Sequence, residues 1–233
     1  MYPVTLTGPR LTLREFRSDD LDASMAVVGD EEVVRTLSFD VRDRDTQAER
    51  LAQDIARART SPRPEYYLAV TDSTDTLIGF ARMGLGRDRS GELGYAIRHE
   101  DWGKGYATEA ATLMIDFGFK TLNLHRIRAA CGPGNHTSQR LLARLGFTPD
   151  GRIRNHVFTD GAWRDSVLYS LPNPEKDGEL VREYVGTVKI QGQPKIHFRV
   201  FASSLDEARA SAVERHGEGI ISVWNEEDAR RTR

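Results

Sequence analysis

The sequence predicts a mixed α/β domain in which helices flank a sheet, followed by a small separate ββαβ domain. Segments with strand-like and helix-like apolar spacing interleave over residues 10–171, and a stretch rich in proline, glycine and charge then interrupts the pattern. The length of 233 residues allows one full domain and one small one. We therefore expect a first domain over 1–172, a linker over 173–179 and a second domain over 180–233.

The first half of the chain predicts a strand, helices and three more strands. Residues 10–16 alternate apolar and polar side chains, and Ser18-Asp19-Asp20 supplies helix-capping chemistry. Apolar residues at helical spacing predict a helix from Asp45 to Arg59, which two prolines end. Strands separated by turn residues are expected at 66–72, 76–85 and 91–98.

The next elements are a helix, a strand and a second helix. Residues 106–122 carry a broad apolar stripe suited to packing on a sheet. A strand is expected over 125–132, followed by a short amphipathic helix with Asn135 as its N-cap and Gly146 as its left-handed stop. The order up to the linker is β-α-α-β-β-β-α-β-α-β-β.

Two hairpin-like patterns complete the chain. Residues 152–171 indicate a long hairpin with Asp160-Gly161 as its turn. Beyond the linker, alternation predicts two strands joined through a glycine-containing turn, then a helix and a last strand, at 182–191, 194–202, 204–216 and 219–225.

Composition limits the classes of ligand. The 33 basic and 35 acidic residues give a formal charge of −2, so no overall field attracts a polyanion; nucleic acid is not indicated, and an anionic ligand needs a local site. A single cysteine, Cys131, excludes an internal disulfide and fits a reducing compartment. Signal-peptide and membrane-span patterns are missing, so we expect a cytoplasmic protein. The six histidines lack metal-ligand spacing, and we expect no metal.

The most informative segment is Trp102-Gly103-Lys104-Gly105-Tyr106-Ala107, between a predicted strand and a predicted helix. Glycines let successive N–H groups converge, and a helix N-terminus adds free donors and about half a positive charge. The Walker and dinucleotide glycine patterns are both absent, which indicates a different diphosphate cofactor. A glycine pair at a helix start also serves as a plain turn, so the surrounding sequence has to decide.

That surrounding sequence resembles a known family. GELGYAIRHEDWGKGYATEAATLMIDFGF, followed by LHRIRAACGPGNHTSQRLLARLGF, is similar to the GNAT superfamily of acetyl-CoA-dependent N-acetyltransferases. The similarity is to the branch that includes the ribosomal-protein N-terminal acetyltransferases, whose members open with a segment like PRLTLREFRSDD and finish with a hairpin like WRDSVLYSL. The resemblance covers about residues 8–172 and does not reach the second domain.

The resemblance implies an acetyl-CoA site. The strands at 91–98 and 125–132 splay apart, and the pantetheine arm lies in the gap, pairing with backbone near Ala96, Ile97 and Arg98. The diphosphate meets residues 103–107. The family motif Q/R-x-x-G-x-G/A falls on Trp102 to Ala107, where Gly105 and Ala107 match and Trp102 replaces the first position, while Lys104 can add a charge to the phosphates.

The resemblance also implies groups around the thioester. Asn135 matches a family asparagine that contacts the pantetheine or caps the helix. Ser138 matches a serine that this branch is thought to use to protonate or hydrogen-bond the departing CoA thiolate; a surface serine near a helix start is the alternative. Many family members carry a tyrosine four residues further on for this role, and Leu142 stands there in this chain.

An attacking amine must be neutral, so a carboxylate that accepts its proton, directly or through water, is expected. Glu92 is the candidate base. Strand alternation puts Glu92 and Ala96 on one face and Leu93, Tyr95 and Ile97 on the other. The alternative is a strand-end glutamate in solvent.

The predicted function is transfer of the acetyl group of acetyl-CoA to a primary amine by direct attack in a ternary complex. No sequence feature pairs Cys131 with a base, so an acyl-cysteine is not favoured. The acceptor is a protein or peptide N-terminus or a small amine, framed by the helical region 20–60 and the hairpin 152–171. A CoA-binding regulatory protein with degenerate catalysis is the alternative, because the family tyrosine is missing and a domain has been added.

For the second domain we expect independent folding and no role in acetyl transfer. A domain this small buries limited apolar surface, so docking on a protein partner or on a second copy, as in a homodimer, would stabilise it. Lys189, Lys195 and Arg199 are offset by several acidic residues, and nucleic acid is again not indicated.

Overall fold

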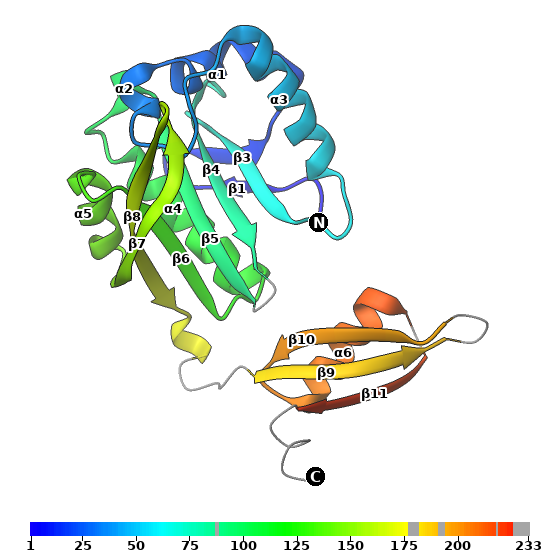
Figure 1. The fold of residues 1–233 in the computed structure, drawn as a ribbon. Helices are drawn as coiled ribbons and strands as arrows, with labels where there is room; N and C mark the ends of the chain where they lie inside the picture. The colour runs from blue at the N-terminus through cyan, green and yellow to red at the C-terminus, as the bar shows by residue number, and fades with distance from the viewer. Residues whose placement is uncertain (87–88, 177–181, 191–193, 218, 226–233) are drawn as a thin grey trace. The chain divides into compact units, whose positions relative to one another are not determined.

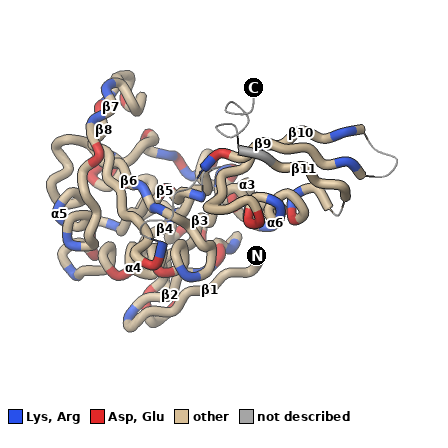
Figure 2. Tube along the Cα trace, turned by 90° about the horizontal axis from the view of Figure 1, so that it is seen from below, with Lys and Arg blue, Asp and Glu red and all other residues tan. Residues whose placement is uncertain are grey.

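The computed structural model describes residues 1–86, 89–176, 182–190, 194–217 and 219–225. It divides into two compact units, Met1–Leu85 with Gly91–Asn173, and Gly86–Ser90 with Pro174–Arg233 (Figure 1). In both units basic and acidic residues are interspersed along the chain (Figure 2), as the near balance of charges leads one to expect.

The first unit is built on an eight-stranded sheet with helices on both faces (Figure 1). In spatial order its strands are β1 (Thr5–Thr7), β2 (Thr12–Glu15), β3 (Glu65–Thr71), β4 (Leu77–Leu85), β5 (Ser90–Ile97), β6 (Arg126–Cys131), β8 (Ala162–Pro172) and β7 (Thr148–Thr159). The helices are α1 (Leu21–Val28), α2 (Glu31–Val34), α3 (Arg44–Ala58), α4 (Tyr106–Asp116) and α5 (His136–Arg144). This confirms the predicted fold class.

Cross-strand register assigns side chains to the two faces of the sheet. On one face, Ala69, Phe80 and Ala96 lie in a row across β3, β4 and β5 and pack with residues of α1 and α2. On the other face, the row Leu68, Ala81 and Tyr95 belongs to a core that includes α4 and α5. The predicted alternation along β5 is therefore present, since Leu93 and Ile97 share the core of Tyr95 while Ala96 does not.

Two local differences from prediction have physical reasons. Strand β1 was not predicted, because three residues, Thr5–Thr7, are too short to show a period. The helix expected over 106–122 is α-helical only to Asp116 and continues as a π-helical turn, Phe117–Thr121. That turn packs Phe117 edge-on against Tyr66 at 4.9 Å between ring centroids.

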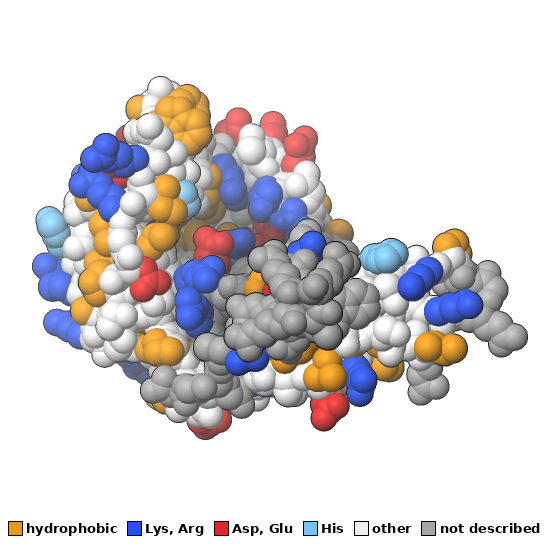
Figure 3. All heavy atoms as spheres, turned by 60° about the horizontal axis from the view of Figure 1, so that its bottom comes forward, with side chains coloured by type: hydrophobic (Ala, Val, Ile, Leu, Met, Phe, Trp, Pro, Cys, Tyr) orange, Lys and Arg blue, Asp and Glu red, His pale blue; other side chains and the backbone are white. Residues whose placement is uncertain are grey.

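The β7–β8 hairpin turns at Asp160 and Gly161, whose φ angles of +52° and +70° are those that a two-residue hairpin turn of the primed type requires. Beside the turn, the rings of Phe158 and Trp163 meet at 5.3 Å and are both mostly exposed. Figure 3 shows hydrophobic side chains exposed on the surface of the first unit. The helix before the hairpin ends as predicted, with Gly146 at φ +87°.

The second unit contains β9 (Arg182–Lys189), β10 (Ile196–Ala202), α6 (Leu205–His216) and β11 (Ile220–Asn225), with β9 between β10 and β11. Tyr184, Val188, Phe198 and Val200 pack with Ala208 and Ala212 of α6 in its own core. Ser204 caps α6 by accepting from the N–H of Glu207 at 3.2 Å. The predicted ββαβ pattern is confirmed; the turn after β9, at 191–193, lies outside the described residues.

The predicted linker begins one residue inside the first unit. Asn173 is buried: its N–H donates to the carbonyl of His125 and its amide to the carbonyl of Leu124, both at 2.9 Å. Pro174–Lys176 form a single 3-10 turn, and residues 177–179 lie outside the described part of the chain. Within the described helices, none has the length and apolar character needed to cross a membrane.

Candidate active site

The loop between β5 and α4 turns at two left-handed glycines. Gly103 and Gly105 have φ angles of +77° and +81°, a region that other residues rarely adopt. Gly105 is the N-cap of α4 and makes no side-chain capping bond, so the first N–H groups of α4 need partners from elsewhere. Apart from its chain neighbours, no described atom lies within 4 Å of the point where a Cβ at Gly103 would stand. The backbone of this loop is therefore open to an anion.

Side chains of the same loop are held by local contacts. Asp101 is buried and accepts from Arg98 Nε at 2.5 Å and from Lys104 Nζ at 2.6 Å. Burial by itself would raise the pKa of Asp101, but the bonds from Lys104 and Arg98 outweigh it and lower the pKa. Lys104 is thus engaged with a carboxylate, although its side chain stays half exposed. Trp102 donates from Nε1 to the carbonyl of Ile97 at 2.7 Å, which ties the loop to the end of β5.

Arg10 also contacts this loop, and the sequence did not indicate it. Its Nη1 donates to the carbonyl of Lys104 at 2.9 Å, and its Nε to Glu109 at 2.8 Å. The guanidinium stands 4.7 Å from the centre of the Tyr106 ring, and Nη2 is 3.5 Å from the Cβ position of Gly105. A second cation, after Lys104, therefore lies beside this loop. The pair Arg10–Glu109 spans 99 positions, which a single sequence cannot connect.

Register shows which backbone groups of β5 face its neighbours. The N–H of Arg98 donates to the carbonyl of Ile78 on β4 at 2.8 Å. Because hydrogen-bonded pairs alternate along antiparallel strands, Ala96 and Arg98 direct their backbone groups toward β4, whereas Tyr95 and Ile97 direct theirs toward β6. Of the three residues expected to pair with pantetheine, only Ile97 faces that side.

Three protic side chains lie close together near the carboxyl ends of β5 and β6. The hydroxyls of Tyr95 and Ser138 are 2.9 Å apart, and the thiol of Cys131 lies near the Ser138 hydroxyl. Asn135 caps α5 by accepting from the N–H of Ser138 at 3.0 Å, so the capping role foreseen for Asn135 is present. Burial raises the pKa of Tyr95 to about 12, against the smaller effect of the Ser138 bond. Sequence analysis assigned Tyr95 only to a strand face and missed this contact.

Glu92 lies on the opposite face of β5, exposed to solvent. It belongs to a row across three strands with Gly84 on β4 and Glu65 on β3. Arg82 leans over Gly84, with Nη2 2.9 Å from the Cβ position of that glycine, and its Nε donates to Glu65 at 2.5 Å. A carboxylate, a guanidinium and a side-chain-free strip of sheet are therefore adjacent on the face covered by α1 and α2.

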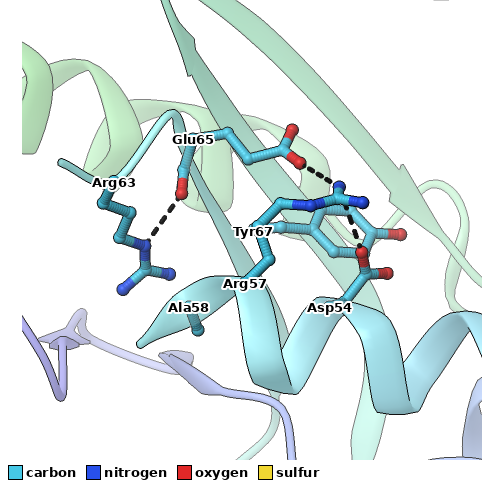
Figure 4. Close-up of a pocket in the computed structure, with 6 residues that line it drawn as sticks. All are labelled: Asp54, Arg57, Ala58, Arg63, Glu65 and Tyr67. Carbon is cyan, nitrogen blue, oxygen red and sulfur yellow. Dashed lines mark hydrogen bonds and ion pairs between the residues drawn. The ribbon is translucent and has the colours of Figure 1, made fainter. Parts of the chain in front are cut away.

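The outer part of this face carries a small polar hollow lined by Asp54, Arg57, Ala58, Arg63, Glu65 and Tyr67. Figure 4 shows Arg57 reaching from α3 toward both Asp54 and Glu65, at 3.5 Å and 2.6 Å. Burial raises the pKa of Asp54 against the effect of Arg50 and Arg57. The ion pairs of Arg57 line this hollow and join α3 to the start of β3 at the edge of the sheet face.

The two segments expected to frame an acceptor are in contact. Arg164 on β8 donates from Nη1 and Nη2 to the carbonyls of Arg35 and Leu37, at 2.6 Å and 2.7 Å. At the hairpin turn, the N–H of Asp160 donates to Asp40 at 2.8 Å.

In the part of the chain that the structure describes, no group of three or more histidine, cysteine, aspartate or glutamate side chains is arranged to hold a metal.

Comparison with known proteins agrees with this geometry. A family model described as an acetyltransferase (GNAT) domain matches residues 10–148. An uncharacterized N-acetyltransferase from Bacillus licheniformis is 32% identical over 184 residues, which cover 78% of this chain and 99% of that protein. The ribosomal protein uS5-alanine N-acetyltransferase of Escherichia coli is 40% identical over 96 residues, 41% of this chain and 50% of that protein.

Solved structures have the same fold. Ribosomal-protein-S5-alanine acetyltransferase from Vibrio fischeri superposes with a TM-score of 0.64 and 27% identity, covering 74% of this chain and 98% of that one. RimJ from Mycobacterium smegmatis, in complex with CoA-disulfide, gives a TM-score of 0.66 and 26% identity, covering 75% and 91% of the two chains. The family model is the match with a stated range, and that range, residues 10–148, ends before the predicted linker.

Proposed function

This chain belongs to the GNAT acetyltransferase family and is an acetyl-CoA-dependent N-acetyltransferase; from this premise, we propose that a primary amine attacks acetyl-CoA directly within a ternary complex. The observation that carries direct attack is the state of Cys131. It is 7% exposed, and burial raises the pKa of its thiol, so the reactive thiolate is disfavoured. The polar group near it is the Ser138 hydroxyl, which is no base.

The proposed cofactor site starts at the loop between β5 and α4. The diphosphate takes the N–H groups of residues 103–107, where both the α4 N-terminus and the left-handed glycines favour an anion. Arg10 and Lys104 supply positive charge beside this loop. The pantetheine arm lies between β5 and β6 and pairs with the backbone of Ile97 and, by register, of Tyr95. Asn135 and Ser138 follow at the start of α5.

Catalysis in this proposal divides between two faces of β5. Glu92 accepts the amine proton, directly or through water, on the face with α1 and α2. Ser138 meets the departing sulfur on the side of α4 and α5. The amine then approaches the thioester from one face of the sheet, and the thiol leaves toward the other face.

Glu92→Gln keeps the size of the side chain but removes the base. We expect kcat to fall about 100-fold and its rise with pH to flatten, because general-base catalysis typically contributes about 10²–10⁴-fold. Steady-state thiol release from acetyl-CoA with a panel of amines measures it. Asp116→Asn, an exposed carboxylate at the end of α4, is the matched control and should change neither quantity. Full kcat in Glu92→Gln across pH 6–9 would remove Glu92 from the mechanism.

The acceptor class that we propose testing first is a peptide N-terminal amine, since the E. coli relative named above acts on the alanine of a ribosomal protein. The same panel of peptides, amino sugars and polyamines separates catalysis from the alternative function, a CoA-binding regulator. A regulator would be stabilised against heat by acetyl-CoA without releasing thiol from any amine.

We propose that the second unit is a separate domain that binds a protein partner or a second copy and takes no part in acetyl transfer. Its apolar core is distinct from the two cores of the first unit. A chain ended after Lys176 keeps the buried Asn173 and should retain the kcat and KM of the full chain in the thiol-release assay. Lost activity in a folded, monodisperse truncation would contradict this and assign part of the active site to the extension.

A further inference from the structure

Tyr95 on β5 and Ser138 on α5 are joined through their hydroxyls at 2.9 Å, and the thiol of Cys131, the last residue of β6, lies near them. Tyr95 and Cys131 belong to the carboxyl-terminal halves of two neighbouring strands joined by the crossover helix α4, and ligands of open α/β sheets usually bind at that end. The contact of Ser138 with Tyr95 spans 43 positions and joins α5 to β5, one of the two strands between which we place the pantetheine.

Donor counts limit what the Ser138 hydroxyl can do. Ser138 has one hydroxyl hydrogen and two lone pairs. Its contact with Tyr95, at 2.9 Å between the two oxygens, can be made with either hydroxyl as the donor. When the phenol donates, the single Ser138 hydrogen is left free for another acceptor, such as a sulfur.

We propose that Tyr95 is a positioning residue that fixes the Ser138 hydroxyl so that its hydrogen points at the sulfur of CoA. The inference rests on the proposed function of this site and extends it. With the phenol of Tyr95 as the donor, the Ser138 hydrogen is free to turn to the CoA sulfur. Tyr95 thus supplies from β5 the hydroxyl that Leu142 does not supply from α5.

The step balances without proton loss from Tyr95. The amine nitrogen forms a bond to the acetyl carbon, its proton passes to Glu92, and the C–S bond breaks with its electron pair going to sulfur. A thiol has an ordinary pKa of about 8.5, so a hydrogen bond is enough to stabilise the leaving thiolate near neutral pH. Glu92 returns the proton to water, and the thiolate takes one from water after release.

The test compares the binding of CoA with that of desulfo-CoA, which lacks only the sulfur. In the full-length wild type, calorimetry should show a preference for CoA that grows as the pH rises through the thiol pKa. Tyr95→Phe should reduce that preference about fivefold while leaving desulfo-CoA binding unchanged, the ratio expected for one hydrogen bond. Ser138→Ala should abolish the preference, and the double variant should be no worse than Ser138→Ala. In turnover, Tyr95→Phe should lower kcat without raising KM for acetyl-CoA.

Tyr169→Phe is the control, because Tyr169 is a buried phenol near Cys131 on β8 and makes no described bond to Ser138. It should leave both affinities as in the wild type. Equal weakening of CoA and desulfo-CoA by Tyr95→Phe would mean a structural role and overturn the inference, as would an unchanged preference. A wild type that binds neither ligand would instead refute the proposed cofactor site, and the inference with it.

Discussion

Gly105→Glu should lower the affinity for acetyl-CoA by at least about 100-fold, which corresponds to about 2.7 kcal/mol. Two effects combine. The φ angle of +81° at Gly105 costs about 1–2 kcal/mol for a residue with a Cβ, so the loop shifts away from the geometry in which its N–H groups converge. The new carboxylate also repels the diphosphate and, with Arg10 Nη2 only 3.5 Å from the Cβ position, competes for the same cation.

Isothermal calorimetry with acetyl-CoA measures the loss, and thermal melting confirms that the variant is folded. Gly217→Glu is the matched control: Gly217 has a φ angle of +86° and an open Cβ position, but it ends α6 in the second unit. It adds the same charge at another glycine with a positive φ angle and should bind acetyl-CoA normally. Gly105→Ala isolates the strain and should cost about tenfold. Near-wild-type affinity in Gly105→Glu would refute the assignment of the diphosphate site.

Much of the fold could be predicted because local signals agree with the tertiary structure. The hairpin turn at Asp160-Gly161 requires two positive φ angles, and the sequence provides residues that tolerate them. Asn135 and Gly146 bound α5 as expected, since caps and stops are chemical features of single residues. Strand β1 was missed because its pairing with β2 comes from the sheet and not from any pattern in three residues.

The candidate site was only partly predictable for a similar reason. The glycines of the loop before α4 are local, and their left-handed conformation follows from residue type. Arg10 and Tyr95 could not be found in this way, because Arg10 bonds a residue 94 positions away and Tyr95 bonds one 43 positions away. The backbone directions along β5 depend on register with β4, which alternation of side chains does not specify.

The same limit applies to the residue whose removal should destabilise the first unit most. Arg63 reads as a surface arginine between two prolines, yet its side chain is 2% exposed. It binds Glu15 through Nη1 at 2.7 Å and Nη2 at 3.0 Å, donates from Nε to the carbonyl of Glu65 at 2.8 Å, and stacks on Tyr66. Glu15 accepts in addition from the N–H of Val4.

Arg63→Ala should therefore lower the free energy of unfolding by about 3–5 kcal/mol, because it leaves the Glu15 carboxylate buried with a single backbone donor. Urea unfolding followed by circular dichroism measures it. Lys120→Ala removes an exposed ion pair with Asp116 and should cost below about 1 kcal/mol. Replacing both partners, Arg63→Met with Glu15→Leu, should be less destabilising than Arg63→Ala, since no charge is then stranded. If Arg63→Ala costs no more than Lys120→Ala, the pair is accessible to water and the predicted anchoring of β2 to the start of β3 is wrong.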